Sequence, residues 1–351
     1  MKKIILFFVS CFLLLSACAS PSTPGQSTGP QTLTVMTHDS FNVSDPVIKA
    51  FEQANNAKVS FLKSGDAGAA LNKAVLTKDA PLADVFYGVD NTFLSRALAA
   101  GIYEPYASPL LKQIPAEFKL DPSNRALPVD YGDVCINYDK AYFAGKGLAV
   151  PQKLEDLTKP EYKGLLVMEN PATSSTGLAF MLATVAHYGD SFTDYWKELK
   201  NNGLVVVDGW NTAYYTNFSG SSGHGPQPMV VSYGSSPAAE VVYAEKKLDD
   251  APTASILGPD TCFRQIEFVG ILKGSKQRAL AEKFVDFMLD KQFQEDMPLQ
   301  MFVYPVDPAA GLPDAFTKYA QAPKQTATVA PDEIAANRDK WIQAWTEAVM
   351  Q

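Results

Sequence analysis

The sequence predicts an α/β fold with two lobes, each built on a mostly parallel sheet flanked by helices. Short apolar segments typical of strands alternate with amphipathic segments typical of helices along most of the chain. Behind an N-terminal targeting segment about 320 residues remain, enough for two domains of roughly 100 to 150 residues each. Two long β-rich stretches, 127–138 and 262–272, separate the alternating blocks and suit crossings between the lobes. A single large doubly wound domain is the alternative, and it would need a sheet with unusually many strands.

The N-terminus has the features of a secretory signal peptide over residues 1–17. Lys2 and Lys3 precede a largely apolar run, and small residues follow around Cys18. The run is shorter than the roughly 20 residues that a membrane-spanning helix needs. Leu15-Ser16-Ala17-Cys18 resembles the lipobox of bacterial lipoproteins, so we expect Cys18 to carry a lipid and residues 18–31 to form a flexible linker. The alternative is a chance cysteine beside an ordinary cleavage site.

The charge and the cysteine content of the sequence argue against nucleic-acid binding and against a cysteine-based metal site. The formal net charge is −8 and Lys and Arg do not cluster, so the chain lacks the basic surface that nucleic-acid binding requires. Of the four cysteines, Cys11 lies in the signal segment and Cys18 is the proposed lipid site. Cys135 and Cys262 remain, either as a disulfide in an oxidising compartment or as two buried thiols. Neither has a CxxC spacing or a neighbouring histidine, so we expect no metal site.

The first block is predicted to pass from strand to helix three times. Its elements are the strand 33–37, the helix from Ser44 to about Asn56, the strand 58–62, the helix 66–78, the strand 83–87 and the helix 91–100. Ser44 can cap the first helix, and Pro46 suits the start of its first turn. Gly101 suits the left-handed residue that ends the third helix.

The second block repeats the alternation after the first β-rich stretch. Its predicted elements are the strand 164–169, the helices 175–187 and 192–201, the strands 204–208 and 229–233, a helix near Pro237, the helix 277–289 and a final helix over about 332–350. We therefore predict that residues 32–128 and 267–351 form lobe 1 and that residues 129–266 form lobe 2.

Catalytic motifs are missing from the sequence. The three histidines are scattered, and neither HExxH, GxSxG nor a phosphate-binding GxxxxGK[ST] occurs. We therefore predict that the protein is not an enzyme and carries no cofactor. A secreted hydrolase that uses carboxylates such as Asp39 and Asp90 is the alternative, because paired carboxylates leave no local motif.

Polar and aromatic loops follow the predicted strands, where ligands bind in α/β folds. These loops are 37–40, 64–66, 88–91, 172–177, 209–211 and 233–237. Ser174 and Ser175 open a helix, so they offer either an anion site or ordinary N-caps, and the sequence leaves both readings open. Trp210 and Tyr233 are predicted to stack on a flat or cationic ligand, whereas Tyr214 is left undecided.

A collinear set of segments resembles the extracellular solute-binding proteins of ABC importers, most closely the thiamine-binding branch. The segments that carry the resemblance are 33–41, 83–91, 129–132, 171–178, 209–210, 231–233, 304–306 and 333–338. The resemblance implies a type II periplasmic-binding fold whose two lobes are joined by two crossings and close on thiamine or its mono- or diphosphate. It also implies an exported, lipid-anchored monomer that delivers its ligand to ABC permease and ATPase subunits.

By position, the resemblance places the phosphate end of the ligand at Ser174, Ser175, Trp210 and Tyr233. The full set of predicted ligand-binding residues is His38, Asp39, Ser64, Gly65, Asp66, Asp90, Ser174, Ser175, Trp210, Tyr215, Tyr233, Ser236 and Phe302. A thiazolium cation suits this set, which supplies aromatic faces and carboxylates.

The sequence departs from the thiamine-binding pattern at four positions, His38, Ser64, Ala239 and Phe302, where Tyr, Asp, Tyr and Trp are expected. A ferric-ion binder of the same fold is a further alternative, with the adjacent Tyr214 and Tyr215 as phenolate ligands.

Overall fold

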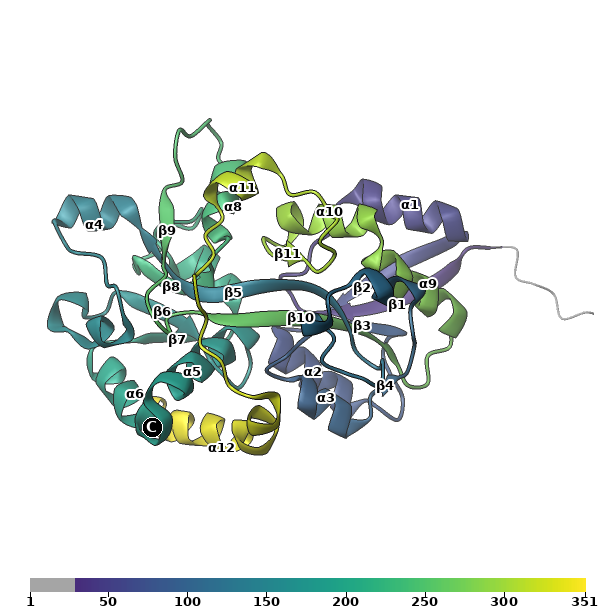
Figure 1. Ribbon diagram of the computed structural model, residues 1–351, viewed down its shortest axis with the longest axis horizontal. Coiled ribbons are helices and arrows are strands. Elements are labelled where there is room, and N and C mark those ends of the chain that lie inside the picture. Colours follow the sequence, from purple (N-terminus) through teal and green to yellow (C-terminus); the bar gives the residue numbers. More distant parts are fainter. Residues whose placement is uncertain (1–28) are drawn as a thin grey trace, which may run out of the picture. The chain divides into compact units, whose positions relative to one another are not determined.

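Two long strands, β5 (Leu127–Asp139) and β10 (Phe263–Leu272), run through the centre of the folded unit Gln31–Gln351 and connect its two lobes (Figure 1). The structure, a computed structural model, describes residues 29–351. The two strands pair antiparallel, and the sheets of both lobes continue from them in the order β2-β1-β3-β10-β5-β8-β6-β7. The two predicted crossings are therefore confirmed.

The first lobe places parallel strands beside β10. β1 pairs parallel with β2 and β3, whereas β3 pairs antiparallel with β10. Helices α1, α9 and α10 cover one face of this sheet, and α2 and α3 cover the other (Figure 1). The elements are β1 (Gln31–Thr37), α1 (Asp45–Asn55), β2 (Ala57–Lys63), α2 (Ala67–Leu76), β3 (Val85–Asp90), α3 (Leu94–Ala100), β4 (Tyr103–Glu104), α9 (Arg278–Leu289) and α10 (Lys291–Gln300).

The second lobe is built on β8, β6 and β7. β6 pairs parallel with both neighbours, while β5 pairs antiparallel with β8 and β9. Helix α5 is buried from Ser175 to Val185, because its residues are apolar or small on every side. The elements are α4 (Lys140–Lys146), β6 (Leu166–Glu169), α5 (Ser175–Tyr188), α6 (Phe192–Asn201), β7 (Val205–Val207), α7 (Trp210–Thr212), a π-helical turn (Ala213–Asn217), β8 (Met229–Tyr233), α8 (Ser236–Val242) and β9 (Thr253–Ile256).

The C-terminal segment returns to the second lobe. It contains β11 (Tyr304–Pro305), α11 (Asp314–Tyr319) and α12 (Pro331–Val349). Helix α12 packs against α6 and also contacts α3. Trp345 is fully buried and meets Trp196 edge to face, with ring centroids 5.6 Å apart. The lobe boundaries at 128/129 and 266/267 stay a prediction.

Cys135 and Cys262 form a disulfide bond in the structure. Cys135 lies in β5 and Cys262 directly precedes β10, where Phe263 is paired with Val134. The bond therefore ties the two crossings together within the second lobe.

The predicted alternation of strands and helices is confirmed, with bounds that differ by a few residues. Helices α4, α7, α10 and α11 and strands β4, β9 and β11 were not predicted. Ser44 precedes α1 as expected, but its side chain caps no N–H group, and the helix ends at Asn56 in the left-handed conformation. Among residues 29–351 no helix combines the length and the apolar character that crossing a bilayer requires.

Candidate ligand-binding site

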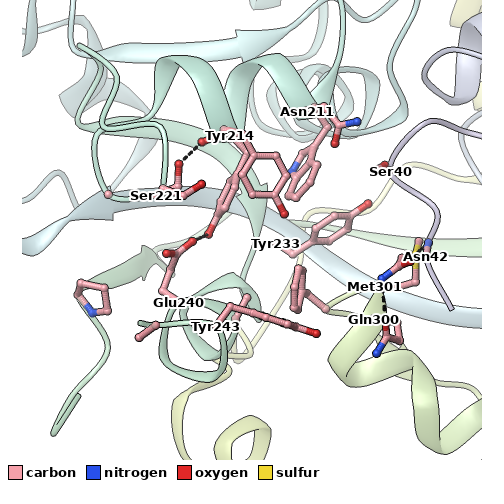
Figure 2. Close-up of a pocket in the computed structure, with 18 of the residues that line it drawn as sticks. Ser40, Asn42, Asn211, Tyr214, Ser221, Tyr233, Glu240, Tyr243, Gln300 and Met301 are labelled. Atoms are coloured by element: carbon pink, nitrogen blue, oxygen red, sulfur yellow. Dashed lines mark hydrogen bonds between the residues drawn. The ribbon is translucent and has the colours of Figure 1, made fainter. Parts of the chain in front are cut away.

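A cavity of about 980 Å³ opens between the lobes and is lined by segments that follow β1, β7 and β8 and by the end of α10. Figure 2 shows Tyr233 near its centre, with Ser40 and Asn42 on the side of the first lobe and Tyr214 and Glu240 on the side of the second. The volume is in the range of small-molecule sites in proteins. Of the predicted residues, those that line the cavity are His38, Asp39, Trp210, Tyr215, Tyr233 and Phe302.

Trp210 is fixed in the cavity wall by its own lobe. Its ring stacks on Tyr214 with centroids 4.8 Å apart and planes 13° apart, and its indole N–H donates to Ser232 Oγ at 2.9 Å. Tyr215 meets the indole edge-on at 5.3 Å. Only 7% of Trp210 is exposed, because Tyr214 covers one of its faces.

The loop after β1 places His38 and Asp39 at the cavity edge. His38 Nδ1 lies 2.8 Å from Ser40 Oγ, and its Nε2 lies 3.3 Å from Glu267 Oε1. Burial alone would lower the pKa of His38, but the charge and the hydrogen bond of Glu267 outweigh burial and raise it. Asp39 Oδ1 accepts the backbone N–H of Gly65 at 2.8 Å, which fixes the adjacent loop.

Ser64, Gly65 and Asp66 lie outside the cavity lining, and Asp66 instead connects the lobes. Its Oδ1 accepts the N–H of Ala67 at the start of α2, and its Oδ2 accepts the backbone N–H of Trp210 at 2.8 Å. Burial raises the pKa of Asp66, and the bond from Trp210 opposes that rise. Beside it Ala69 N–H donates to Thr173 O at 3.2 Å. The loops 64–66 and 209–211, both of which the sequence predicts to contact ligand, therefore contact each other.

Ser174, Ser175 and Ser236 are buried and do not line the cavity. Ser174 Oγ lies 3.0 Å from Thr176 Oγ1, and Ser175 Oγ accepts from Gln265 Nε2 at 3.1 Å. The side chain of Ser174 makes no capping bond to α5, although it occupies the N-cap position. The assignment of these serines to the ligand stays a prediction.

Asp90 is fully buried beneath the cleft, where Thr92 donates to its Oδ1 at 2.8 Å. Burial raises the pKa of Asp90 to about 7, although the bond from Thr92 opposes the shift. Next to it Tyr87 donates to Asp130 Oδ2 at 2.6 Å on β5. Burial raises the pKa of Asp130 well above its ordinary value. Asp90 ends β3 and Asp130 lies in the crossing strand β5, and neither lines the cavity.

Several cavity residues were missed in the sequence, among them Asn42, Glu240, Tyr243, Gln300 and Met301. Tyr243 stands one helical turn beyond Ala239, so the spacing along α8 places both on one side of the helix. The spacing could have suggested Tyr243 once Ala239 was considered. Gln300 and Met301 carry no such signal, because only the folding of α10 against the first lobe brings them to the cavity.

Comparison with known proteins identifies the family. Residues 80–336 match the family described as bacterial extracellular solute-binding protein. The chain belongs to this family. Family membership assigns it a solute-binding role outside the cytoplasm, and the predicted resemblance is confirmed.

Among its relatives, this solute-binding protein is 31% identical over 342 residues to the thiamine-binding periplasmic protein of Salmonella typhimurium strain LT2. The alignment covers 96% of this chain and 97% of that protein. A solved structure of a periplasmic thiamin binding protein matches with a TM-score of 0.80 at 28% identity, covering 93% of this chain and 98% of the other. The ferric binding protein from Campylobacter jejuni shares the fold, with a TM-score of 0.72 at 20% identity and coverage of 90% and 99%.

Proposed function

We propose that the solute is thiamine, free or as its mono- or diphosphate, captured between the two lobes for delivery to an ABC importer. The observation that carries the proposal is the cavity, to which both lobes contribute aromatic rings, including Tyr233 and Tyr243 from one lobe and Phe302 from the other. A thiazolium cation is attracted by aromatic faces and by carboxylates. The thiamine-binding names of the relatives, which align along nearly the whole chain, support the same ligand.

Capture follows from the two-lobed arrangement. With the lobes apart the ligand meets one wall of the cavity, and with the lobes together it meets both, so ligand binding favours the closed state. The importer's permease and ATPase subunits would then accept the closed form. Cys18, which lies outside the described residues, is proposed to hold the protein through its lipid at the cell membrane, on the extracellular or periplasmic side.

The ferric alternative is disfavoured by the surroundings of its two tyrosines. Tyr214 donates its hydroxyl proton to Glu240 Oε1 at 2.7 Å, and burial raises the pKa of both Tyr214 and Tyr215. A raised pKa opposes the phenolate form that would bind iron.

The hydrolase alternative has no matching geometry. Asp39 lines the cavity, but Asp90 is buried away from it, so the two carboxylates do not face a common substrate.

Calorimetry on the purified mature protein tests the proposal with thiamine, thiamine monophosphate and thiamine diphosphate. We expect saturable heat and a rise in melting temperature with at least one of the three. Ferric citrate is the control ligand, and we expect the protein to retain no red-brown iron–tyrosinate colour after free ferric citrate has been removed. The absence of heat and of any thermal shift with all three thiamine compounds would contradict the assignment and leave the solute-binding family unaffected.

A further inference from the structure

Four carboxylates line the cavity, and their hydrogen bonds distinguish them. Asp139 is fully engaged, because its Oδ1 caps α4 through the N–H groups of Ala141 and Tyr142 and its Oδ2 accepts from Ser219 at 2.6 Å. The Asp39 carboxylate accepts from the backbone N–H of Gly65, and the ammonium group of Lys63 donates to the backbone carbonyl of Asp39 at 3.0 Å. Glu245 is exposed to solvent.

Glu240 differs from the other three. It is half-buried on α8, and Tyr214 donates to its Oε1 at 2.7 Å. No donor among residues 29–351 reaches its Oε2 within hydrogen-bonding distance. Burial raises the pKa of Glu240, and the bond from Tyr214 and the charge of His224, which also lines the cavity, oppose the rise. The site thus holds an incompletely neutralised carboxylate in partly dry surroundings, where a cation interacts more strongly than in water.

Aromatic rings stand next to this carboxylate. Tyr243 lies three residues further along α8, and residues at this spacing are neighbours on a helix surface. Tyr215 is 41% exposed in the cavity, and its ring centroid lies 5.4 Å from that of Tyr214, the residue that donates to Glu240. Figure 2 shows Glu240 between Tyr214 and Tyr243 on the wall of the second lobe.

Tyr243 also closes this end of the cavity against the first lobe. Its hydroxyl donates to Leu299 O at 2.5 Å, and its ring meets Phe302 edge to face at 5.7 Å. Phe302 adopts a left-handed backbone conformation with φ 58°, which is rare for a bulky residue and recurs at ligand clamps.

We propose that Glu240 is the counter-ion of the ligand's positively charged ring, which it holds against the rings of Tyr215 and Tyr243. The inference rests on the proposed function and deepens it, because it assigns one end of the cavity to the thiazolium. Ser40, Asn42 and Lys63 also line the cavity and offer hydroxyl, amide and ammonium donors for the alcohol or phosphate end of the same molecule. This position differs from the one implied by the family resemblance, which puts the phosphate end at Ser174, Ser175, Trp210 and Tyr233.

The variant Glu240→Gln tests the assignment, because its amide oxygen can still accept the proton of Tyr214 while the charge is removed. We expect the affinity for thiamine to fall roughly tenfold or more in calorimetry. The affinity for a neutral analogue, in which a thiophene ring replaces the thiazolium, should be the same in the variant and in the wild type. Glu240→Asp keeps the negative charge, so it should lose less affinity for thiamine than Glu240→Gln does.

Glu198→Gln is the matched control, since Glu198 is exposed on α6 away from the cavity, and it should bind thiamine as the wild type does. Wild-type affinity for thiamine in Glu240→Gln would overturn the inference while leaving the proposed function intact. An equal loss of the cationic and the neutral ligand would also overturn it, since it would indicate a structural role. Failure of the wild type to bind thiamine would refute both proposals together.

Discussion

Trp210 combines a structural role with a place in the cavity wall. One face of its indole packs on Tyr214, its ring N–H is bound to Ser232, and its backbone N–H is bound to Asp66 of the other lobe. The exposed part of the ring still lines the cavity. Loss of this side chain should therefore affect both the stability of the second lobe and the affinity for the ligand.

We predict that Trp210→Ala weakens thiamine binding by about 1 to 3 kcal/mol, the sum of lost apolar contact and lost cation–π attraction. Calorimetry below the melting temperature of the variant measures the effect. Trp341→Ala is a suitable control, because Trp341 packs on the core from α12 and does not line the cavity. Unchanged affinity in Trp210→Ala would indicate that the ligand stacks on Phe302 and Tyr243 instead of Trp210.

Single residues of the site could be predicted where the local sequence carries the signal. Gly209-Trp210 after a strand and Tyr233 at the end of another were found for this reason. The sequence does not distinguish a loop that contacts ligand from one that contacts the opposite lobe. Asp66 and Thr173 fall in the second group, because their bonds to Trp210 and Ala69 depend on how the lobes meet.

At the scale of elements, prediction succeeded where capping and periodicity agree. Helix α3 ends at Gly101, whose φ of 67° fits the left-handed cap expected there. Helix α10 was missed because Pro298 lies inside it, which contradicts the usual rule for helix interiors. Helix α4 carried usable signals, an Asp139 cap and a left-handed Gly147, at the end of a long strand where no helix was sought.

The disulfide belongs to the scale of elements, since it links β5 to β10. We predict that the free energy of unfolding of the double variant Cys135→Ala, Cys262→Ala is about 2 to 4 kcal/mol lower than that of the wild type. The disulfide stabilises the wild type because it restricts the unfolded chain. Urea unfolding with and without reductant measures the difference. Reductant should destabilise the wild type and leave the double variant unchanged. Two thiols titrating in the denatured, unreduced protein, apart from Cys18, would contradict the bond.

At the scale of the whole molecule, few polar contacts hold the lobes together around the cavity. They include the bonds Asp66–Trp210, Ala69–Thr173, Tyr243–Leu299 and Ser235–Phe302, and away from the cavity Arg338 of α12 donates to Ser95 of α3. The crossing strand β10 has register shifts next to Phe268, against both β3 and β5. Such irregularities bend a strand and interrupt its pairing. We expect the lobes to separate by bending at this position, which requires breaking only a few hydrogen bonds.

The proposed lipid anchor also concerns the whole molecule, because it would decide where a captured ligand is held. The sequence places Cys18 after the signal-peptide features and before a stretch rich in Ser, Thr, Pro and Gly, all of it outside the described residues except Gly29 and Pro30. Stable attachment requires two acyl chains, since a buried methylene contributes only about 0.8 kcal/mol and one chain binds marginally. A diacylglyceryl group on Cys18 would supply both chains.

We predict that Cys18→Ala moves the protein from the membrane fraction to the soluble fraction, or halts its processing, and that labelled palmitate marks the wild type alone. Cys11→Ala is the matched control, because Cys11 lies inside the signal segment and its loss should leave both labelling and fractionation unchanged. Ligand binding should be the same in the soluble Cys18→Ala protein, since the cavity is formed entirely by residues 38–302 of the folded unit. A wild-type protein that is fully soluble with an unmodified N-terminus would refute the anchor without affecting the binding site.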